Sequence, residues 1–372
     1  MLTASHLTKL LRLSALVFLI TSCSTTKALD DKLYEVQFLD EYIIPANFKF
    51  QNEIYGGVSG VDYTKGVLLM VNDSPSNPLI FRARLKLKGF QVDTITFKSV
   101  IRLQNNTFFE KNAMDMESIR YDGDGYLIST EGSINSSLSP RIFKVSKTAE
   151  FIKSYSLPDY FLVKGNNQPR HNGVFEGLSN SMNSSGFWFA NELPLEKDGK
   201  SPKLYNTNSP IRLSFFDHKE EKVTRQYAMD LDRITKIPLL PFSINGLTEI
   251  LQVGQDTFLV LERSYSAGHK SQGNKVKLYL VDVSKATDIH AIAKLEVASS
   301  KDIIYAEKSL VFDFKSIKRK LTKGIVDNME GLCFGPILPN GNSSLIVVSD
   351  NNFNKFGTQL NQIILLELKQ IQ

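Results

Sequence analysis

The chain has 372 residues, of which 42% are hydrophobic and 22% charged, a composition typical of a globular protein with a sizeable core. Without Lys9 and Arg12 near its start, the 44 basic residues fall to 42, against 39 acidic residues. An excess this small does not indicate binding to nucleic acid.

The first 22 residues have the pattern of a lipoprotein signal peptide. Lys9 and Arg12 precede an apolar run at residues 13–20, which is shorter than the roughly 20 residues needed to span a bilayer. The run ends in Ile20-Thr21-Ser22-Cys23, where small residues precede a thiol that can be acylated. We therefore predict lipidation at Cys23, a tether over residues 23–32 and a bacterial envelope location, with the outer membrane favoured. An ordinary secretory signal is the alternative.

Five segments of the remaining chain repeat one plan: an apolar start with an acid, a polar turn, an apolar run and a second acid. They span residues 56–74, 114–133, 173–193, 245–264 and 328–352. The opening acids are Glu117, Glu176, Glu249 and Glu330, with Ser59 in the first copy. The closing acids are Asp73, Glu131, Glu192, Glu262 and Asp350.

Each copy predicts a β-hairpin. The turns are rich in Gly, Asn, Asp and Ser, and the returning runs, such as FWFA at residues 187–190, are β-branched or aromatic. A hairpin brings the start of its first strand beside the end of its second, at about 5 Å between Cα atoms. We therefore expect the opening and closing acids of each copy to lie side by side.

Further strand-like runs separate the hairpins, so one hairpin with two outer strands predicts a four-stranded propeller blade. The predicted fold is an all-β propeller over residues 33–372. Five to seven blades fit the length; six are favoured, with residues 33–38 and 362–368 closing one blade together. Residues 315–323 form one basic run, which we interpret as a solvated loop or short helix rather than a phosphate or membrane patch.

A propeller places every hairpin's open end on one face, near the axis, so the nine acids would converge there. Two like charges about 4 Å apart cost about 4 kcal/mol at an effective dielectric of 20, so the group needs cations, basic partners or raised pKa values. Oxygen ligands without histidine clusters indicate Ca²⁺, with Mg²⁺ as the second choice. The alternative for any one acid is a loop staple that accepts backbone N–H groups.

These segments together resemble the family called esterase-like activity of phytase. The resemblance rests on GGVSGVDY, DMESIRYDGDGYLISTEGS, FEGLSN with FWFANE, GLTEIL with FLVLERSYSAG, and NMEGLCFGPILPNGNSSLIVVSDNNF. It implies a propeller, an acidic active centre and action on phosphate esters, with acids of the family at Glu117, Glu176, Glu249, Glu330 and Asp350. The chain departs from the family at residues 72–74 (Asn-Asp-Ser) and at residues 170–173 (Arg-His-Asn-Gly).

The leading functional hypothesis is a metal-dependent phosphoesterase. The predicted catalytic residues are Glu117, Glu176, Glu249 and Glu330. The predicted cation ligands are Asp73, Glu131, Glu192, Glu262 and Asp350. Arg170, His171 and Arg263 would bind the phosphate. Two alternatives stay open: a non-catalytic propeller that binds a ligand or protein with a structural cation, and a lactonase-type hydrolase. The expected partners are a small phosphate ester and the membrane through the anchor, with no nucleic acid, and the expected state is a monomer.

Overall fold

The computed structural model describes residues 33–103, 106–163, 167–297, 302–354 and 358–371. Contacts divide the chain into a small unit of the two ends, residues 1–33 and 371–372, and a large unit, Tyr34–Gln370. The predicted signal peptide, Cys23 and the predicted tether lie outside the described residues. In the described part of the chain, no helix is both long enough and apolar enough to span a membrane.

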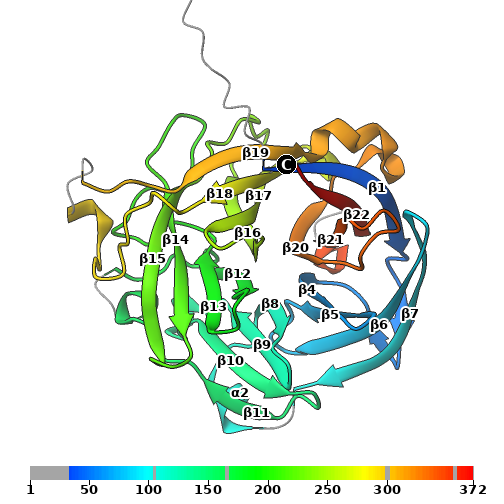
Figure 1. Cartoon of the computed structure of the whole chain (residues 1–372), viewed down its shortest axis with the longest axis horizontal. Helices are drawn as coiled ribbons and strands as arrows, with labels where there is room; N and C mark the ends of the chain where they lie inside the picture. The colour runs from blue at the N-terminus through cyan, green and yellow to red at the C-terminus, as the bar shows by residue number, and fades with distance from the viewer. Residues whose placement is uncertain (1–32, 104–105, 164–166, 298–301, 355–357, 372) are drawn as a thin grey trace, which may run out of the picture. The chain divides into compact units, whose positions relative to one another are not determined.

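The large unit consists of five antiparallel four-stranded sheets arranged around a central axis, as the blades of a propeller (Figure 1). Blade 1 contains β4 (Val58–Thr64), β5 (Val67–Asn72), β6 (Leu79–Lys88) and β7 (Gln91–Arg102). Blade 2 contains β8 (Met116–Tyr121), β9 (Gly125–Thr130), β10 (Arg141–Ser146) and β11 (Phe151–Ser154). Blade 3 contains β12 (Phe175–Asn180), β13 (Gly186–Asn191), β14 (Pro210–Asp217) and β15 (Lys222–Asp230). Blade 4 contains β16 (Ser243–Gln252), β17 (Thr257–Ser266), β18 (Asn274–Asp282) and β19 (Glu307–Asp313).

Blade 5 joins the two ends of the large unit. It contains β20 (Asn328–Phe334), β21 (Ser343–Asp350), β22 (Asn361–Gln370) and, on its outer edge, β1 (Tyr34–Ile44). The register runs from Tyr34 opposite Gln370 to Ile44 opposite Asn361. The predicted pairing of residues 33–38 with 362–368 is therefore confirmed, and it extends further along both strands.

The predicted propeller is confirmed, and the chain has five blades, within the predicted range but one fewer than the favoured six. Each of the five repeated hairpins forms the inner pair of one blade, so the repeat count equals the blade count. The length that suggested a sixth blade lies in long outer strands, such as β6 and β7, and in the segments 192–209, 231–242, 283–306 and 314–327.

Apolar contacts between neighbouring sheets hold the ring together. The inner-pair strands β9 and β13 are buried along their whole length, because each sheet is covered on both faces. Five apolar clusters fill the five spaces between blades; one, for example, packs Trp188 of blade 3 against Phe258 of blade 4. The remaining elements are short: β2 (Lys49–Phe50), β3 (Glu53–Ile54), α2 (Thr107–Lys111) and 3₁₀ turns, of which η5 (Phe314–Lys320) is the longest.

Candidate functional site

A β-bulge lies near the start of the inner strand of every blade. The register shifts at one residue in each hairpin, and the five bulge residues are Ser59, Glu117, Glu176, Thr248 and Glu330. A bulge leaves one residue unpaired and re-aims its side chain, which is why bulges are common beside active sites. Three of these five positions carry a glutamate.

In each hairpin, one residue at or near the end of the second strand lies opposite the residue two places before the bulge, and we call this the closing position. Backbone pairing identifies the residues at this closing position as Asp73, Glu131, Glu192, Arg263 and Asp350. With Asp115, which lies two residues before Glu117, these side chains and the bulge glutamates surround one end of the axis. We call this set the carboxylate mouth: Asp73, Asp115, Glu117, Glu131, Glu176, Glu192, Glu330 and Asp350, with Arg263.

Blade 4 corrects the sequence alignment of the acids. Thr248 and Arg263 occupy the bulge and closing positions there, whereas Glu249 and Glu262 each lie one residue away, opposite Leu261 and Leu247. Successive residues of a strand point to opposite faces, so a shift of one residue changes what a side chain contacts. The prediction that Glu249 and Glu262 are equivalent to the other acids is therefore wrong.

Glu249 lies deeper on the axis and is paired with Arg120. Its carboxylate is 2.9 Å from the Arg120 guanidinium, and both side chains are buried. The carboxylate also accepts hydrogen bonds from Ser118 Oγ and the Leu178 N–H. Arg120 in turn donates to the carbonyls of Val61, Ile119, Ile250 and Leu332, which lie two residues after the bulge in four different blades. This pair closes the axis beneath the mouth.

Glu262 faces the outer part of blade 4. It accepts hydrogen bonds from Lys308 Nζ (2.6 Å), Asn245 Nδ2 (3.0 Å) and the Asp232 N–H (3.1 Å). All its contacts are to groups within its own blade or the loop before it. The structure therefore places Glu262 in a local ion-pair network and outside the carboxylate mouth.

The mouth carboxylates raise one another's pKa values. Burial raises the pKa of Glu117 and of Glu176 well above the usual range, and neighbouring acids raise it further. Burial and Glu192 raise the pKa of Glu131 to about 8, although the Val174 N–H opposes the rise. Burial raises the pKa of Glu192 to about 7, although Arg263 opposes the rise. Without a cation these carboxyl groups therefore keep their protons to a higher pH than exposed acids do, and a bound cation would favour their ionised forms.

The acids of the mouth differ in the hydrogen bonds that their carboxylates accept. Glu330 accepts from Ser59 Oγ and Asn328 Nδ2, and Asp350 accepts from the Asn352 N–H and from Asn328, which joins the two acids. By contrast, the carboxylates of Glu117 and Glu176 accept no hydrogen bond from the described part of the chain, although these residues are only 6% and 7% exposed. The staple explanation therefore fits Asp350, which accepts a backbone N–H, but not Glu117 and Glu176.

Two groups of three acids bring ligand atoms close enough for one ion. They are Asp115, Glu117 and Glu131, and Glu131, Glu176 and Glu192; in each group the chosen oxygens lie within 4.8 Å of one another. Glu131 belongs to both groups. The predicted pairing of Glu117 with Glu131 and of Glu176 with Glu192 is confirmed. All ligands are carboxylate oxygens, the donor set that suits Ca²⁺ or Mg²⁺.

Arg263 is the basic residue of the mouth. Its guanidinium lies 3.3 Å from Glu330 and 3.6 Å from Glu192, and its side chain is 13% exposed. Among the described residues, nothing accepts a hydrogen bond from its Nε. Arg263 therefore neutralises part of the charge of these acids.

The other two predicted phosphate-binding residues lie away from these contacts. Arg170 donates to the carbonyls of Pro194 and Gly199, so its guanidinium fixes the loop that follows β13. His171 is exposed on the same segment. The structure thus joins Arg263, but not Arg170, to the mouth acids by ion pairs.

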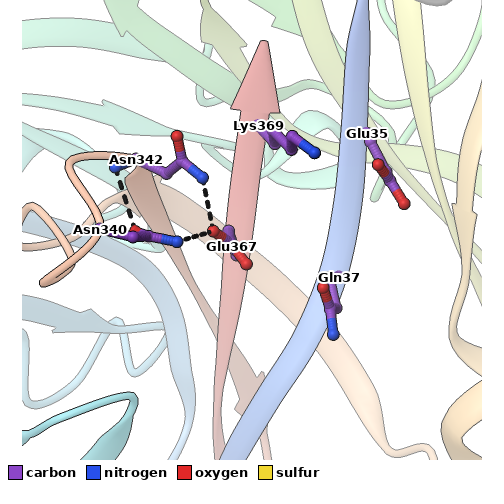
Figure 2. A pocket seen from close by; sticks show the side chains of 6 residues that line it. All are labelled: Glu35, Gln37, Asn340, Asn342, Glu367 and Lys369. Carbon is purple, nitrogen blue, oxygen red and sulfur yellow. Dashed lines mark hydrogen bonds between the residues drawn. The ribbon is translucent and has the colours of Figure 1, made fainter. Parts of the chain in front are cut away.

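A pocket of about 340 Å³ lies at the opposite end of the strands from the mouth (Figure 2). It lies beside the closed end of the β20–β21 hairpin, and Glu35, Gln37 and Lys369 complete its lining. Glu367 accepts hydrogen bonds from Asn340 and Asn342 there, and these bonds lower its pKa. This acid is satisfied locally, in contrast to Glu117 and Glu176.

Sequence reasoning missed Asp115, the axial Arg120 and the register of blade 4. An apolar residue lies two places after every bulge, at Val61, Ile119, Leu178, Ile250 and Leu332. Alignment on this apolar position, instead of on the acids, places Thr248 with the bulge glutamates. No comparable signal marks Arg120, because its partners are backbone carbonyls.

Comparison with known proteins identifies the family. A search of the curated proteins finds no match. Among solved structures, the glutaminyl cyclase of Myxococcus xanthus is 11% identical with a TM-score of 0.40, over 91% of this chain and 98% of that one. A GH43 endo-arabinanase from Bacillus licheniformis is 10% identical with a TM-score of 0.38, over 83% and 92%. A protein of unknown function from Dyadobacter fermentans is 10% identical with a TM-score of 0.42, over 90% and 99%.

Similarities this weak carry no information about function. The sequence match to a family model, in contrast, covers most of the chain. As the resemblance predicted, the Phytase-like model, described as esterase-like activity of phytase, matches residues 53–353, and the chain therefore belongs to this family.

Proposed function

We propose that the protein is a phosphoesterase that depends on a divalent cation, with the carboxylate mouth as its site. One observation carries the proposal: Glu117 and Glu176 are buried and accept no hydrogen bond from the described residues, and they belong to two overlapping groups of acids beside Arg263. Leaving such charges uncompensated is costly, and a cation compensates them. Family membership supports phosphate esters as the substrate class.

The residues that would hold the cation are Glu117, Glu131, Glu176 and Glu192, with Asp115 at the edge. The bound cation would supply electrostatic stabilisation of the charge on the phosphate oxygens. Arg263 would bind the same oxygens through its guanidinium, which suits phosphate because its N–H groups form a planar fork. Glu330, held by Ser59 and Asn328, would accept a proton from the attacking water.

The test is an assay of the purified protein against phosphomonoesters, phosphodiesters and lactones with Ca²⁺, Mg²⁺ and Mn²⁺, before and after EDTA. Phosphate release should require the cation and should fall by about two orders of magnitude or more in Glu176→Gln. Glu367→Gln, which removes an acid at the opposite end of the strands, is the matched control and should keep full activity.

Each other outcome points to a named alternative. A protein that cations stabilise but that hydrolyses no ester would be a binding module with a structural ion. Cation-dependent opening of lactones without phosphate release would indicate a lactonase-type hydrolase. Activity that survives EDTA and the Glu176→Gln change would refute the proposed site.

We also propose that the protein is anchored in the bacterial envelope by lipid at Cys23. The support is the sequence pattern at residues 13–23. Cys23→Ser should move the protein out of the membrane fraction and abolish labelling by palmitate. Cys333→Ser is the matched control, because Cys333 is buried in the propeller and should leave labelling unchanged. Labelling that persists in Cys23→Ser would refute the anchor.

A further inference from the structure

Residues 237–242 form an apolar loop between blades 3 and 4. Four of its side chains are largely exposed: Ile237 (72%), Leu239 (68%), Leu240 (59%) and Phe242 (56%). Single exposed apolar residues are ordinary, but four within six residues mark a site of interaction. Pro238 and Pro241 restrict the backbone of the loop.

The loop is fixed in position. The N–H groups of Leu239 and Leu240 donate to the Ala267 carbonyl, and His269 Nε2 lies 2.8 Å from the Ile237 carbonyl. The Phe242 ring packs near Tyr265. These contacts hold the backbone of the loop while its apolar side chains are exposed.

The loop stands on the same face as the carboxylate mouth and rises above it. In blade 4 the pairing continues from Leu247 opposite Glu262 to Ser243 opposite Ser266, and Ser243 lies four residues beyond Leu247. The inner strands of blades 1, 2 and 3 begin within one residue of their bulges. Four extra residues of strand carry the loop about 13 Å further out.

Beside the loop is a cavity of about 160 Å³ lined by four lysines, Lys236, Lys275, Lys315 and Lys318, with Gln272 and Asn274. Lys236 precedes the loop directly, and Lys315 and Lys318 belong to η5. In the part of the chain that the structure describes, no acidic side chain lines this cavity or forms an ion pair with these lysines, although Asp313 lies near enough to Lys275 to oppose the lowering of its pKa. Burial and the neighbouring lysines lower the pKa of Lys236 and of Lys275, as expected for crowded positive charge.

We propose that the apolar loop and the lysine cavity dock the propeller on an anionic lipid bilayer. The tips of residues 237–242 would enter the interface between headgroups and acyl chains, and the lysines would bind lipid phosphates. Apolar tips beside uncompensated lysines match the layered chemistry of an anionic membrane, with phosphates above hydrocarbon. A protein partner would need acidic groups and an apolar cleft in that arrangement.

Vesicle binding tests the proposal. The chain from residue 24 onward contains every strand of the five blades and carries no lipid, so its binding reports the docking surface alone. Sedimentation with phosphatidylcholine vesicles is compared with sedimentation with vesicles that contain phosphatidylglycerol, in EDTA so that no cation bridges protein and lipid. Binding should require the anionic lipid and weaken with added salt.

Two variants and their controls divide the contributions. Lys315→Gln with Lys318→Gln should weaken binding by about thirty-fold, because each lysine near an anionic surface contributes about fivefold. Leu239→Ser with Leu240→Ser should weaken it by about tenfold or more. The controls are Lys65→Gln with Lys88→Gln and, for the leucines, Ile337→Ser; these exposed residues lie in turns at the opposite end of the strands and should leave binding unchanged.

A fluorescent probe locates the contact. Trp188, the one native tryptophan, is buried and should not respond to vesicles. In Leu240→Trp the emission should shift to the blue on anionic vesicles, whereas in Ile337→Trp it should not. Equal binding by the leucine variant and the unaltered chain would overturn the proposal. So would a failure to bind anionic vesicles, which would leave the loop to a protein partner. Docking needs no cation at the mouth, so this result is independent of the hydrolysis assay.

Discussion

At the scale of single residues, Glu176 and Glu249 show how the surroundings of a buried glutamate define its role. Both lie on inner strands and both are buried. Glu249 has Arg120, Ser118 and the Leu178 N–H around its carboxylate. Burial raises its pKa to about 7, and Arg120 opposes this rise more than any other group does. Glu176 has other acids around it and no donor in the described chain. The first is a structural ion pair, and the second is free to bind a ligand.

This difference predicts opposite effects of the same substitution. In Glu249→Gln the Arg120 charge stays buried without its counterion, so the free energy of unfolding should fall by about 3–5 kcal/mol. In Glu176→Gln one repelling charge is removed, so the metal-free protein should be as stable as the unaltered chain or more stable. Urea unfolding in EDTA measures both. Destabilisation by Glu176→Gln, with no effect of Glu249→Gln, would contradict the assigned roles.

Gly246 gives a second test, because it makes room for a mouth carboxylate. A Cβ atom at this position would lie 2.4 Å from Cγ and 2.6 Å from Oε1 of Glu192. Gly246→Ala should therefore displace Glu192 and weaken Ca²⁺ binding, which calorimetry would measure, with little loss of stability in EDTA. Unchanged Ca²⁺ affinity in Gly246→Ala would exclude Glu192 as a ligand.

At the scale of elements, the hairpins could be predicted from sequence, but their bulges could not. Repeated apolar runs and turn residues identified all five hairpins, because these signals are local. A bulge adds one residue on one strand, and its position depends on pairing that the polarity pattern does not specify. In blade 4 an acid happens to lie next to each key position, so an alignment on acids placed Glu249 and Glu262 one residue from the equivalent positions. For the same reason, the alignment did not identify Thr248 as the bulge residue or place Arg263 opposite Gly246.

The closing blade predicts where the domain begins. β1 supplies the outer strand of blade 5 and pairs with β22 along its length. A chain that starts at residue 45 would expose the edge of β22 and the apolar side chains that β1 covers, so it should aggregate. A chain that starts at residue 33 should melt at the temperature of the longer mature chain. Size-exclusion chromatography and thermal melts compare the two. A soluble, folded chain from residue 45 would show that β1 is dispensable.

At the scale of the whole molecule, the features with possible functions all lie at one end of the propeller. The bulges, the carboxylate mouth, the apolar loop and the lysine cavity all belong to the end where the inner strands begin. The sequence predicted that the acids would converge there, since radial repetition follows from the repeats alone. It could not predict that the basic run near residue 315 joins Lys236 and Lys275, because these residues meet only through the tertiary fold. The interpretation of that run as a plain solvated segment therefore omitted the lysine cavity.

The mouth also couples stability to pH and to cations. The ordinary pKa of glutamate is about 4.3, and in the folded protein burial and neighbouring acids raise that of Glu131 to about 8, and burial raises that of Glu192 to about 7. A carboxyl group with a raised pKa in the folded state stabilises the fold fully below its unfolded pKa. That contribution is lost as the pH rises through the folded pKa. The melting temperature in EDTA should therefore fall between pH 5 and pH 9.

Ca²⁺ should reverse this loss, because it binds the deprotonated carboxylates of the folded state and competes with protons. The rise in melting temperature on adding Ca²⁺ should be small at pH 5 and should grow towards pH 9, at about 2 °C for each kcal/mol of binding free energy. The double variant Glu131→Gln with Glu176→Gln should lose most of the response, since both acid groups lose members, whereas Glu367→Gln should keep it. A Ca²⁺ response that is equal at pH 5 and pH 9 would show that the ion binds elsewhere. If the metal-free protein instead gained stability with rising pH, ionisation of the mouth carboxyl groups would not destabilise the fold. The site would then have no excess of negative charge for a cation to neutralise.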